Sequence, residues 1–404
     1  MKYLILLITF STLSFALDYE LVINEPGLND QQSTVIEDKF INLLNQTPKG
    51  ETVYLNIYGM KMPHIAKEVV RTKSRGVNIH ILMRPFKDQG SIDSYKILEP
   101  AFPGNDGSTL SICGLYCSAT AFNHNKFMLI SKLKTGEKNI AIHTSNNFWD
   151  DERNNYNDFL IIKNNSSLYS QLKSYFTHLK KGRLGNWNRS FKKEIDSEVT
   201  MYTYPAPIYK RVRGKRVKTG KYHNYALDIL NTVKCTDGAK VYFAHSRFTD
   251  DRLDVAYKLK DLKQEGCDVK VFLKNDVSTD KFKIPLIGIT IEIVKDSPGV
   301  KVKEILGDIL TVFPYEEEIN GRPWEEGDPK KNALHSKIIM IHAPIKGQGD
   351  SMQKMVLVGT HNFDKPSLKL NNELLLKIQN DELYDEYLDS FLRLEADFMS
   401  TYGQ

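Results

Sequence analysis

Two short motifs in this chain combine residue types that can act together on a phosphate group. Each has a histidine and a lysine separated by one residue, in His124-Asn-Lys126 and His335-Ser-Lys337. A histidine can attack phosphorus or protonate a leaving oxygen, and a lysine can neutralise phosphate oxygens. The triplet alone is a weak signal, because a chain of this composition contains one about once by chance. A third copy, His178-Leu-Lys180, is present and serves as an internal control.

The residues that follow the first two motifs separate them from the third. Each is followed by a hydroxyl and an amide two residues apart, and then, eleven residues after the amide, by a carboxylate. The groups are Ser145, Asn147 and Asp158 in the first copy and Thr360, Asn362 and Glu373 in the second. The segment after His178 has neither feature. A four-part pattern that occurs twice therefore predicts a functional site.

These groups have complementary chemistry around a phosphate. The lysines and asparagines supply hydrogen-bond donors, with Ser145 and Thr360 as further substrate-binding groups. One histidine attacks phosphorus while the other protonates the leaving oxygen. Asp158 and Glu373 would each orient a histidine through its second ring nitrogen. The predicted catalytic residues are His124, His335, Lys126, Lys337, Asn147, Asn362, Asp158 and Glu373.

The motifs lie on two related halves of the chain. Each half has a strand, a helix and a strand, followed by three apolar strands. The first half has them at 53–58, 65–72, 75–82, 126–130, 139–142 and 158–162. The second half has them at 240–245, 253–262, 266–273, 337–341, 355–358 and 373–376. Gly76 and Gly266 occupy the same place, where a helix C-cap needs a left-handed residue.

Strands as apolar as these are typical of sheets that helices cover on both faces. We therefore predict an α/β fold of two tandem α/β/α lobes. The strand ends, where open α/β folds place ligands, would meet at a pseudo-twofold interface and complete one site there. The predicted domains are a signal peptide at 1–16, an N-terminal lobe at 17–204, a basic linker at 205–230 and a C-terminal lobe at 231–404.

The N-terminus and the cysteines predict an oxidising compartment. Lys2, an apolar run and Ser14-Phe-Ala16 form a secretory signal, so we expect a secreted or periplasmic protein cleaved after Ala16. A retained anchor is the alternative, but the run is short of the roughly 20 apolar residues that span a bilayer. The four cysteines pair as Cys113 with Cys117 and Cys235 with Cys267, or remain buried free thiols. No Cys-x-x-Cys pair occurs, and neither a metal nor a cofactor is predicted.

Composition excludes wholesale disorder and a fibrous design, since the 404 residues are 41% hydrophobic and 26% charged. The net charge of +5 permits an anionic partner without requiring one. The basic stretch within 205–224 is either a solvated linker or a loop that touches an anionic substrate or membrane surface. The acidic stretches Asp150-Asp-Glu152 and 316–326 are interpreted as solvated surface. No GxGxxG or P-loop pattern supports a nucleotide cofactor.

At the paired motifs the chain resembles the phospholipase D superfamily, whose signature is a repeated His-x-Lys with a downstream Gly-Ser-x-Asn. In the first copy the resemblance rests on the His-x-Lys segment 122–131 and the downstream segment 144–147, and in the second copy on 335–337 and 359–362. The two-lobed similarity covers nearly the whole mature chain. In the residues of these motifs it is most similar to secreted phospholipase D-like proteins. The resemblance implies phosphodiester cleavage without a metal through a covalent phosphohistidine. It also implies that His124 is the nucleophile and His335 the acid.

The chain departs from the family pattern at three positions. The family places an aspartate five residues after each motif lysine, where this chain has Ser131 and His342. That aspartate is thought to support the fold rather than the chemistry, yet its loss puts full activity and the substrate preference in doubt. Thr144 replaces the motif glycine in the first copy, which is a milder change.

The leading functional hypothesis is a secreted phospholipase D that hydrolyses a phospholipid to phosphatidic acid. A nuclease or other phosphodiesterase on the same site is the alternative within enzymes. The chain lacks the spaced aromatic platforms and strongly basic balance typical of nucleic-acid binding, which favours lipid. An inactive phosphate-binding module is the third hypothesis. The expected partners are a phosphodiester substrate and an anionic membrane surface, and one chain holding both half-sites should act as a monomer.

Overall fold

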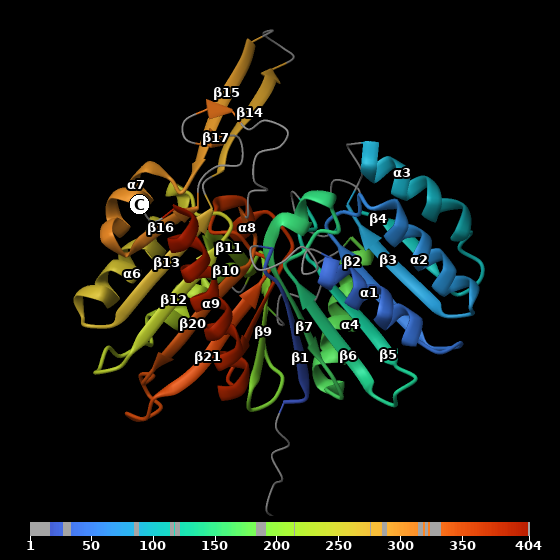
Figure 1. Cartoon of the computed structure of the whole chain (residues 1–404), viewed down its shortest axis with the longest axis horizontal. Helices are drawn as coiled ribbons and strands as arrows, with labels where there is room; N and C mark the ends of the chain where they lie inside the picture. Colours follow the sequence, from blue (N-terminus) through green and yellow to red (C-terminus); the bar gives the residue numbers. More distant parts are fainter. Residues whose placement is uncertain are drawn as a thin grey trace, which may run out of the picture.

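The structure is a computed structural model with two mixed sheets that lie side by side, each flanked by helices (Figure 1). It describes residues 17–26, 34–84, 89–113, 117, 122–182, 191–213, 215–274, 276–284, 289–313, 318–319, 322–323 and 333–402. The predicted signal peptide at 1–16 lies outside these residues. The α/β fold of two related lobes is confirmed.

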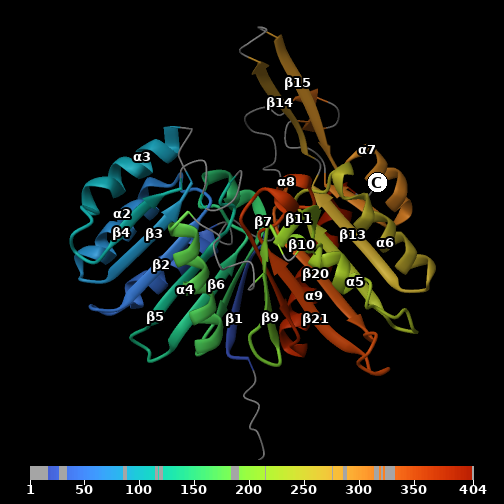
Figure 2. The ribbon, with the colours of Figure 1, turned by 180° about the vertical axis from the view of Figure 1, so that it is seen from behind.

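The first sheet has the strand order β4-β3-β2-β5-β6-β7-β1. Its strands are β1 (Tyr19–Asn24), β2 (Thr52–Ile57), β3 (Asn78–Met83), β4 (Thr109–Ile112), β5 (Phe127–Lys132), β6 (Lys138–Thr144) and β7 (Asn155–Ile162). One face carries α1 (Val35–Gln46), α2 (Pro63–Ser74) and α3 (Gln89–Leu98), and the other carries α4 (Ser166–Lys180), as Figures 1 and 2 show. Short 3-10 turns follow α3, as η2 (Glu99–Ala101), and precede β7, as η3 (Asp150–Asn154).

The second sheet has the order β16-β13-β12-β20-β21-β22-β9-β8. Its strands are β8 (Lys192–Glu194), β9 (Val199–Tyr204), β12 (Lys240–His245), β13 (Asp268–Lys274), β16 (Leu310–Phe313), β20 (Lys337–Ala343), β21 (Gln353–Gly359) and β22 (Glu373–Ile378). The helical segments of this half are α5 (Tyr225–Leu230), η5 (Asp250–Arg252), α6 (Leu253–Gln264), α7 (Val300–Leu306), η6 (Gly307–Ile309), α8 (Lys365–Lys369) and α9 (Asp381–Tyr402).

The two sheets repeat one topology. In each, the first two strands of the half pair in parallel, β2 with β3 and β12 with β13, and the motif-bearing strands β5 and β20 pair antiparallel to β2 and β12. The helices α4 and α9, which follow the last motif strand of each half, lie on opposite faces of the molecule. Figure 1 shows α9 in front, and Figure 2 shows α4 in front. This arrangement is that of a pseudo-twofold axis between the lobes.

The predicted lobe boundary at 204 is wrong. β8 and β9 precede that boundary, yet they extend the second sheet, where β9 pairs antiparallel with β22 from Glu373–Tyr204 to Ile378–Val199. Sheet membership therefore places the change of lobe before Lys192. The reason is that β9 fills the place beside β22 that β1 fills beside β7, so each lobe needs a strand from ahead of its own repeat.

Three hairpins stand outside the two sheets: β10 (Pro207–Val212) with β11 (Lys215–Tyr222), β14 (Asp276–Ile284) with β15 (Ile289–Ser297), and β17 (Glu318–Ile319) with β18 (Arg322–Pro323). The first lies within the segment predicted as a basic linker, so this segment has its own ordered pairing. The second projects from the body of the molecule in both views (Figures 1 and 2). The third is the described part of the acidic stretch.

One hydrophobic core runs through both lobes. It includes Phe127 and Tyr175 from the first lobe together with Leu374 and Tyr387 from the second. A second core fills the space between the first sheet and the helices α1 to α3. Because apolar burial continues across the interface, the lobes are held together by the same force that folds each of them. The interface can therefore support a site with parts from both.

Local details also agree with the sequence. Gly76 and Gly266 have φ values of 86° and 101°, the left-handed conformation that a helix C-cap requires. Cys113 is bonded to Cys117, and Cys235 is bonded to Cys267, so the alternative of four free thiols is wrong.

Candidate active site

Each motif histidine is anchored to the opposite lobe by its backbone. The amide of His124 donates to the carbonyl of Asn372 over 2.9 Å, and the amide of His335 donates to that of Tyr156 over 3.0 Å. The short strand β19 (Ala333–Leu334), which precedes His335, pairs in parallel with the start of β7. Both motifs therefore begin at the interface, where β5 and β20 start.

The first histidine is held by a carboxylate of the second lobe. Glu373, the first residue of β22, places its two oxygens 2.9 and 3.0 Å from Nδ1 of His124. The hydroxyl of Thr360 donates to the same carboxylate over 2.8 Å. Because a carboxylate only accepts, Nδ1 carries the proton, and Nε2 keeps the lone pair that a nucleophile needs. Glu373 thus occupies the place that the sequence assigns to it.

The second histidine is held by a carboxylate of the first lobe that the sequence reading assigned to the surface. Oε2 of Glu152 lies 3.0 Å from Nδ1 of His335, and Oδ1 of Asn157 lies 3.2 Å from the same nitrogen. Glu152 is only 2% exposed, so its interpretation as solvated surface is wrong. Amide groups of Asn147, Asn155 and Asn157 donate to its carboxylate. These donors replace the water that a buried carboxylate loses.

Asp158, which the sequence predicts as an orienting carboxylate, contacts neither motif histidine. Its Oδ2 accepts a hydrogen bond from Tyr387 over 3.2 Å and lies 3.7 Å from Nε2 of His143. The reason is a one-residue offset in β7: Thr144 pairs with Phe159 and its counterpart Gly359 pairs with Leu375, so Asn157 rather than Asp158 is equivalent to Glu373. Side chains alternate along a strand, so Asp158 points away from the face on which Asn157 meets His335.

The motif lysines are buried beside the histidines. Nζ of Lys126 donates to the carbonyl of His124 over 3.1 Å, and Nζ of Lys337 donates to that of His335 over 2.8 Å. Burial, and then the charge of Lys337, lower the pKa of Lys126 to about 7. Burial lowers the pKa of Lys337 to about 8. A bound anion would favour the charged forms that burial disfavours in these two lysines, so the site is suited to an anion.

The histidines are uncharged at neutral pH in this arrangement. Burial lowers the pKa of His124, although Glu373 opposes the shift. Burial likewise lowers the pKa of His335 to about 4, with Glu152 opposing. The rings are not sealed, since their side chains are 12% and 19% exposed. A phosphodiester anion bound beside them would raise both pKa values, which favours proton donation by a histidine only when substrate is present.

The predicted substrate-binding hydroxyls lie behind the site. Both side chains are fully buried and bonded to internal partners. Ser145 donates to Asn157 over 2.9 Å, and Thr360 donates to Glu373. Their contacts are those of positioning groups, which corrects the predicted contact with substrate.

The two motif asparagines make different hydrogen bonds. Asn147 donates to Glu152, and its Oδ1 is buried without a hydrogen-bond partner. Oδ1 of Asn362 accepts from the hydroxyl of Ser246 over 3.0 Å, so its amide hydrogens remain as donors.

The structure explains the departures from the family pattern. Ser131 donates to Glu51 over 2.6 Å and accepts from the amide of Thr52, so it ties β5 to β2 far from the motif end of the strand. Its counterpart His342 lies near the end of β20, with its ring 5.9 Å from that of Tyr384. Neither residue contacts the motif groups, which agrees with a fold-supporting role at both positions.

The glycine position also differs between the copies for a local reason. A side chain at Gly359 would come 2.8 Å from the carbonyl of Leu374. In the first copy Thr144 fits, because its hydroxyl donates to the carbonyl of Asp158 over 2.7 Å. The control triplet behaves as expected, since His178 and Lys180 lie on α4, and Lys180 donates to Thr109.

Sequence reasoning missed an aromatic side chain at the site. The ring of Tyr58, just after β2, lies edge-on to that of His124 with centroids 4.7 Å apart. Lys126 places Nζ 5.0 Å from the centre of the same ring, and Arg84 places its guanidinium carbon 4.0 Å from it. The ring of Trp149 is 5.8 Å away. No spacing rule could have found this group, because its members lie at the ends of four different strands, β2, β3, β5 and β6.

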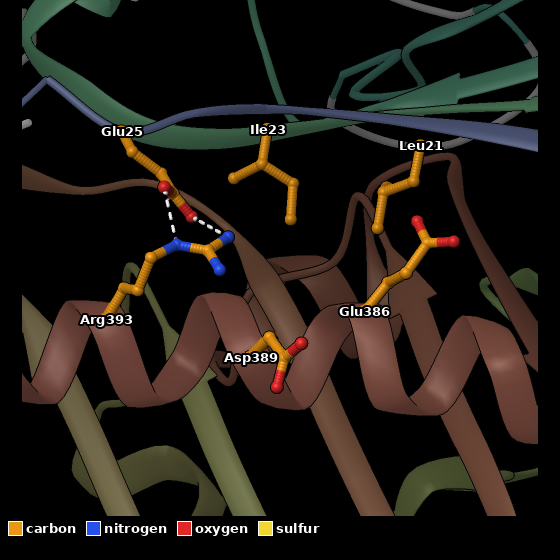
Figure 3. Close-up of a pocket in the computed structure, with 6 residues that line it drawn as sticks. All are labelled: Leu21, Ile23, Glu25, Glu386, Asp389 and Arg393. Atoms are coloured by element: carbon orange, nitrogen blue, oxygen red, sulfur yellow. Dashed lines mark hydrogen bonds and ion pairs between the residues drawn. The ribbon is translucent and has the colours of Figure 1, made fainter.

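A hollow elsewhere in the molecule is not this site. A cavity of about 240 Å³ between β1 and α9 is lined by Leu21, Ile23, Glu25, Glu386, Asp389 and Arg393 (Figure 3). It contains no motif residue, and Arg393 is paired with Glu25 across it. Among the described residues, no group of three or more histidines, cysteines or carboxylates is placed to hold a metal ion. No helix in that part of the chain is long and apolar enough to cross a membrane.

Comparison with known families decides the identity of the fold. A family model described as "Cardiolipin synthase, PLD-like domain" matches residues 40–180 and 231–395. These two segments coincide with the two halves of the repeat and together make up most of the chain. The chain belongs to the phospholipase D superfamily. A search of curated proteins gave no match.

Solved structures share this phospholipase D fold at low sequence identity. Phosphatidylserine synthase of Haemophilus influenzae is 12% identical with a TM-score of 0.55, and the match covers 92% of this chain and 87% of that one. Polyphosphate kinase of Porphyromonas gingivalis is 12% identical with a TM-score of 0.51, over 92% of this chain and 49% of that one. The chain thus spans about half the length of that kinase. Yeast tyrosyl-DNA phosphodiesterase is 12% identical with a TM-score of 0.46, over 90% of each chain.

Proposed function

We propose that the protein is a phosphodiesterase that works through a covalent phosphohistidine at His124. The observation that supports this most directly is the crossed pairing of the histidines. Each has Nδ1 against a buried carboxylate from the other lobe, Glu373 for His124 and Glu152 for His335. That pairing leaves both Nε2 atoms available for chemistry.

The reaction proceeds in two displacements. In the first, Nε2 of His124 forms a bond to phosphorus while the bond from phosphorus to the leaving oxygen breaks, and His335 gives that oxygen a proton. In the second, a water oxygen bonds to phosphorus, His335 takes the proton from the water, and the phosphorus–nitrogen bond breaks. His124 is then restored, and no group besides water is consumed.

The chain itself supplies the charge that stabilises the transition state. Lys126 and Lys337 neutralise the non-bridging oxygens, and the amide of Asn362 adds a donor. The step needs no metal ion, because these cations do the work of charge neutralisation. We therefore expect turnover to persist in excess chelator.

Phospholipid is the substrate that the sequence favours, as in a phospholipase D. The family description, which names cardiolipin synthase, also supports a phospholipid. The structural relatives do not select among substrates, because proteins named for different reactions share this fold. Nucleic acid is the second candidate, because the aromatic ring of Tyr58 and the guanidinium group of Arg84 lie beside His124.

The proposed mechanism is tested with bis(p-nitrophenyl) phosphate in excess chelator. Its leaving group needs little protonation, so His335→Asn should release a burst of one nitrophenolate per protein and then stall. His124→Asn should give neither burst nor turnover. A stalled phosphoenzyme that is stable to base and labile to acid would identify the nitrogen–phosphorus bond. Equal burst from both variants would refute the assignment of His124 as nucleophile.

We also propose that the protein is exported. Two disulfides support an oxidising compartment, since such bonds persist outside the reducing cytosol. Expression of the full chain followed by N-terminal sequencing of the exported product should find Leu17 as its first residue. Recovery of the intact N-terminus in a membrane fraction would instead support a retained anchor.

A further inference from the structure

Glu152, the carboxylate that holds His335, lies on a segment with little regular structure of its own. The turn η3 has five residues, and its N-cap residue, Trp149, makes no side-chain hydrogen bond to it. Short 3-10 turns have weaker internal hydrogen bonds than an α-helix, so contacts with the surrounding lobe must fix their geometry. Those contacts therefore decide where the side chain of Glu152 lies.

The backbone of this segment is held by Asn24, the last residue of β1. Nδ2 of Asn24 lies 3.4, 3.1 and 2.8 Å from the carbonyl oxygens of Glu152, Arg153 and Asn155. Asn24 is buried, so water does not compete for these carbonyls. The contacts fix the backbone at Glu152 and just after it.

The side chain of Arg153 is held by Glu37, in the first turn of α1. Nε and Nη2 of Arg153 donate to the two oxygens of Glu37 over 2.6 and 2.7 Å. The Glu37 side chain is only 5% exposed, and a two-bonded arginine–carboxylate pair of this kind holds both groups in one relative geometry. The same carboxylate lies 2.9 Å from Nε2 of His64, on α2. Neither partner of Glu37 is a motif residue, yet Arg153 is the chain neighbour of Glu152.

The second lobe has different residues at the same spacing from its motif. Five residues after Asn362 stands Ser367 in place of a carboxylate, and its hydroxyl accepts from the backbone amide of Asn362 over 3.2 Å. The next residue is Leu368, a buried apolar side chain that cannot form an ion pair. The ion pair thus occurs in the lobe that supplies its carboxylate from η3, and not at the matching position of the lobe that supplies it from β22. This coincidence favours a role for the ion pair in placing Glu152.

We propose that Glu37 and Arg153 are positioning residues for His335, because their ion pair holds η3 so that Glu152 stays against Nδ1 of that histidine. A general acid that is displaced from its productive geometry loses much of its effect. The rate at which the leaving oxygen is protonated would then depend on an ion pair that touches no reacting atom. The inference rests on the proposed function, in which His335 is the general acid.

Two diesters that differ in their need for an acid test the inference. The nitrophenolate of bis(p-nitrophenyl) phosphate needs little protonation to leave, whereas the phenolate of diphenyl phosphate leaves less readily. Under single-turnover conditions, Glu37→Gln and Arg153→Gln should each lower the rate of phenol release about tenfold. Release of nitrophenolate should change by less than about twofold. A variant that merely lost part of its folded population would lower both rates equally.

Two further variants separate positioning from loss of the fold. The double variant of Glu37→Gln with Arg153→Gln should be no slower than either single variant, because each single change already removes the same ion pair. Arg153→Lys keeps the cation and loses only the planar fork. Its rate of phenol release should therefore lie between that of the wild type and that of Arg153→Gln.

Arg71→Gln is the matched control, because Arg71 pairs with Glu68 on α2 and its replacement removes the same charge from the same lobe. Two results would overturn the inference: Glu37→Gln and Arg153→Gln match this control, or they slow both diesters equally. If the wild-type protein released no nitrophenolate, the proposed function itself would be refuted. Failure of the positioning inference is therefore distinguishable from failure of the proposed function.

Discussion

Each motif histidine is oriented by a carboxylate from the opposite lobe, but the two carboxylates come from different places in the repeat. Glu373 begins its strand, whereas Glu152 lies in η3, ahead of β7. Asn157 occupies the position of Glu373 in the sheet, and Asp158, one residue later, is turned toward Tyr387. Both histidines therefore have a carboxylate at Nδ1, as pseudo-twofold symmetry requires, but the two carboxylates come from positions that are not equivalent in the repeat.

Replacement of the two carboxylates should separate their roles. Glu152→Gln removes the charge that favours the protonated form of His335, whose pKa is already lowered to about 4. We expect kcat toward a diester with a poor leaving group to fall about 100-fold, the scale of a lost general acid. The alkaline limb of the pH profile should also move to lower pH, because the imidazolium becomes a stronger acid.

Asp158→Asn is the matched comparison for that variant. The pKa of Asp158 is raised by burial, so an uncharged amide of the same size fits its surroundings, and kcat and the pH profile should be unchanged. If Asp158→Asn reproduced the loss while Glu152→Gln did not, the assignment of Glu152 would be wrong.

The reason why the sequence identified one carboxylate and not the other is physical. The repeat shows only which positions have the same spacing along the chain, and Asp158 and Glu373 both lie eleven residues after a motif asparagine. It does not report the register of β7, in which Asp158 lies one residue beyond the position equivalent to Glu373 and therefore on the opposite face. Glu152 stands in an acidic run that looks solvated, and only the amides of Asn147, Asn155 and Asn157 around it make its burial tolerable.

At the scale of elements, the apolar strands and the helices of both repeats were predictable because each buries a continuous face. β7 is buried along its whole length, and its neighbour β6 is buried from Ile140 to its end. The outer strands β1 and β9 were not found, since they belong to the repeat only through their partners β7 and β22. The hairpin β10–β11 was hidden for a different reason, because its basic residues are typical of a solvated linker.

The two disulfides should contribute unequally to the stability of these elements. Cys235–Cys267 closes a loop with a sequence separation of 32, and Cys113–Cys117 closes one of 4. On the chain-entropy account, removal by paired alanine substitutions should cost about 4 kcal/mol for the first and about 2 kcal/mol for the second. Urea denaturation of each double variant measures the difference. Equal losses would show that strain or residual structure in the unfolded chain outweighs loop length.

At the scale of the whole molecule, several histidines are buried without charge. Burial lowers the pKa values of His143 and His361 to about 3 each, and the pKa of His245 well below its usual range. The core that spans both lobes surrounds them, so protonation requires the fold to open. Their protonation therefore affects the free energy of unfolding of the whole two-lobed structure rather than that of one lobe.

The free energy of unfolding should fall as pH decreases below about 6.5. The unfolded chain takes up these protons near pH 6.5, while the folded chain does not until about pH 3 for His143 and His361. In this window the unfolded state binds more protons, so each histidine contributes a slope of up to about 1.4 kcal/mol per pH unit. Urea midpoints between pH 7 and pH 5 measure the slope. His361→Gln should flatten it, and an unchanged slope in that variant would contradict the account.

The crossed pairing of histidines and carboxylates has a consequence for the order in which the protein becomes active. The N-terminal lobe leaves the ribosome with His124 in place but without Glu373, which comes 249 positions later. On the proposed mechanism, a partly made chain therefore carries the nucleophilic histidine without the carboxylate that orients it, and Lys126 without Lys337. The site is complete only when the second lobe packs against the first. On the proposed mechanism the protein would therefore cleave no phosphodiester during its own synthesis, and a fragment that lacks β22 would stay inactive.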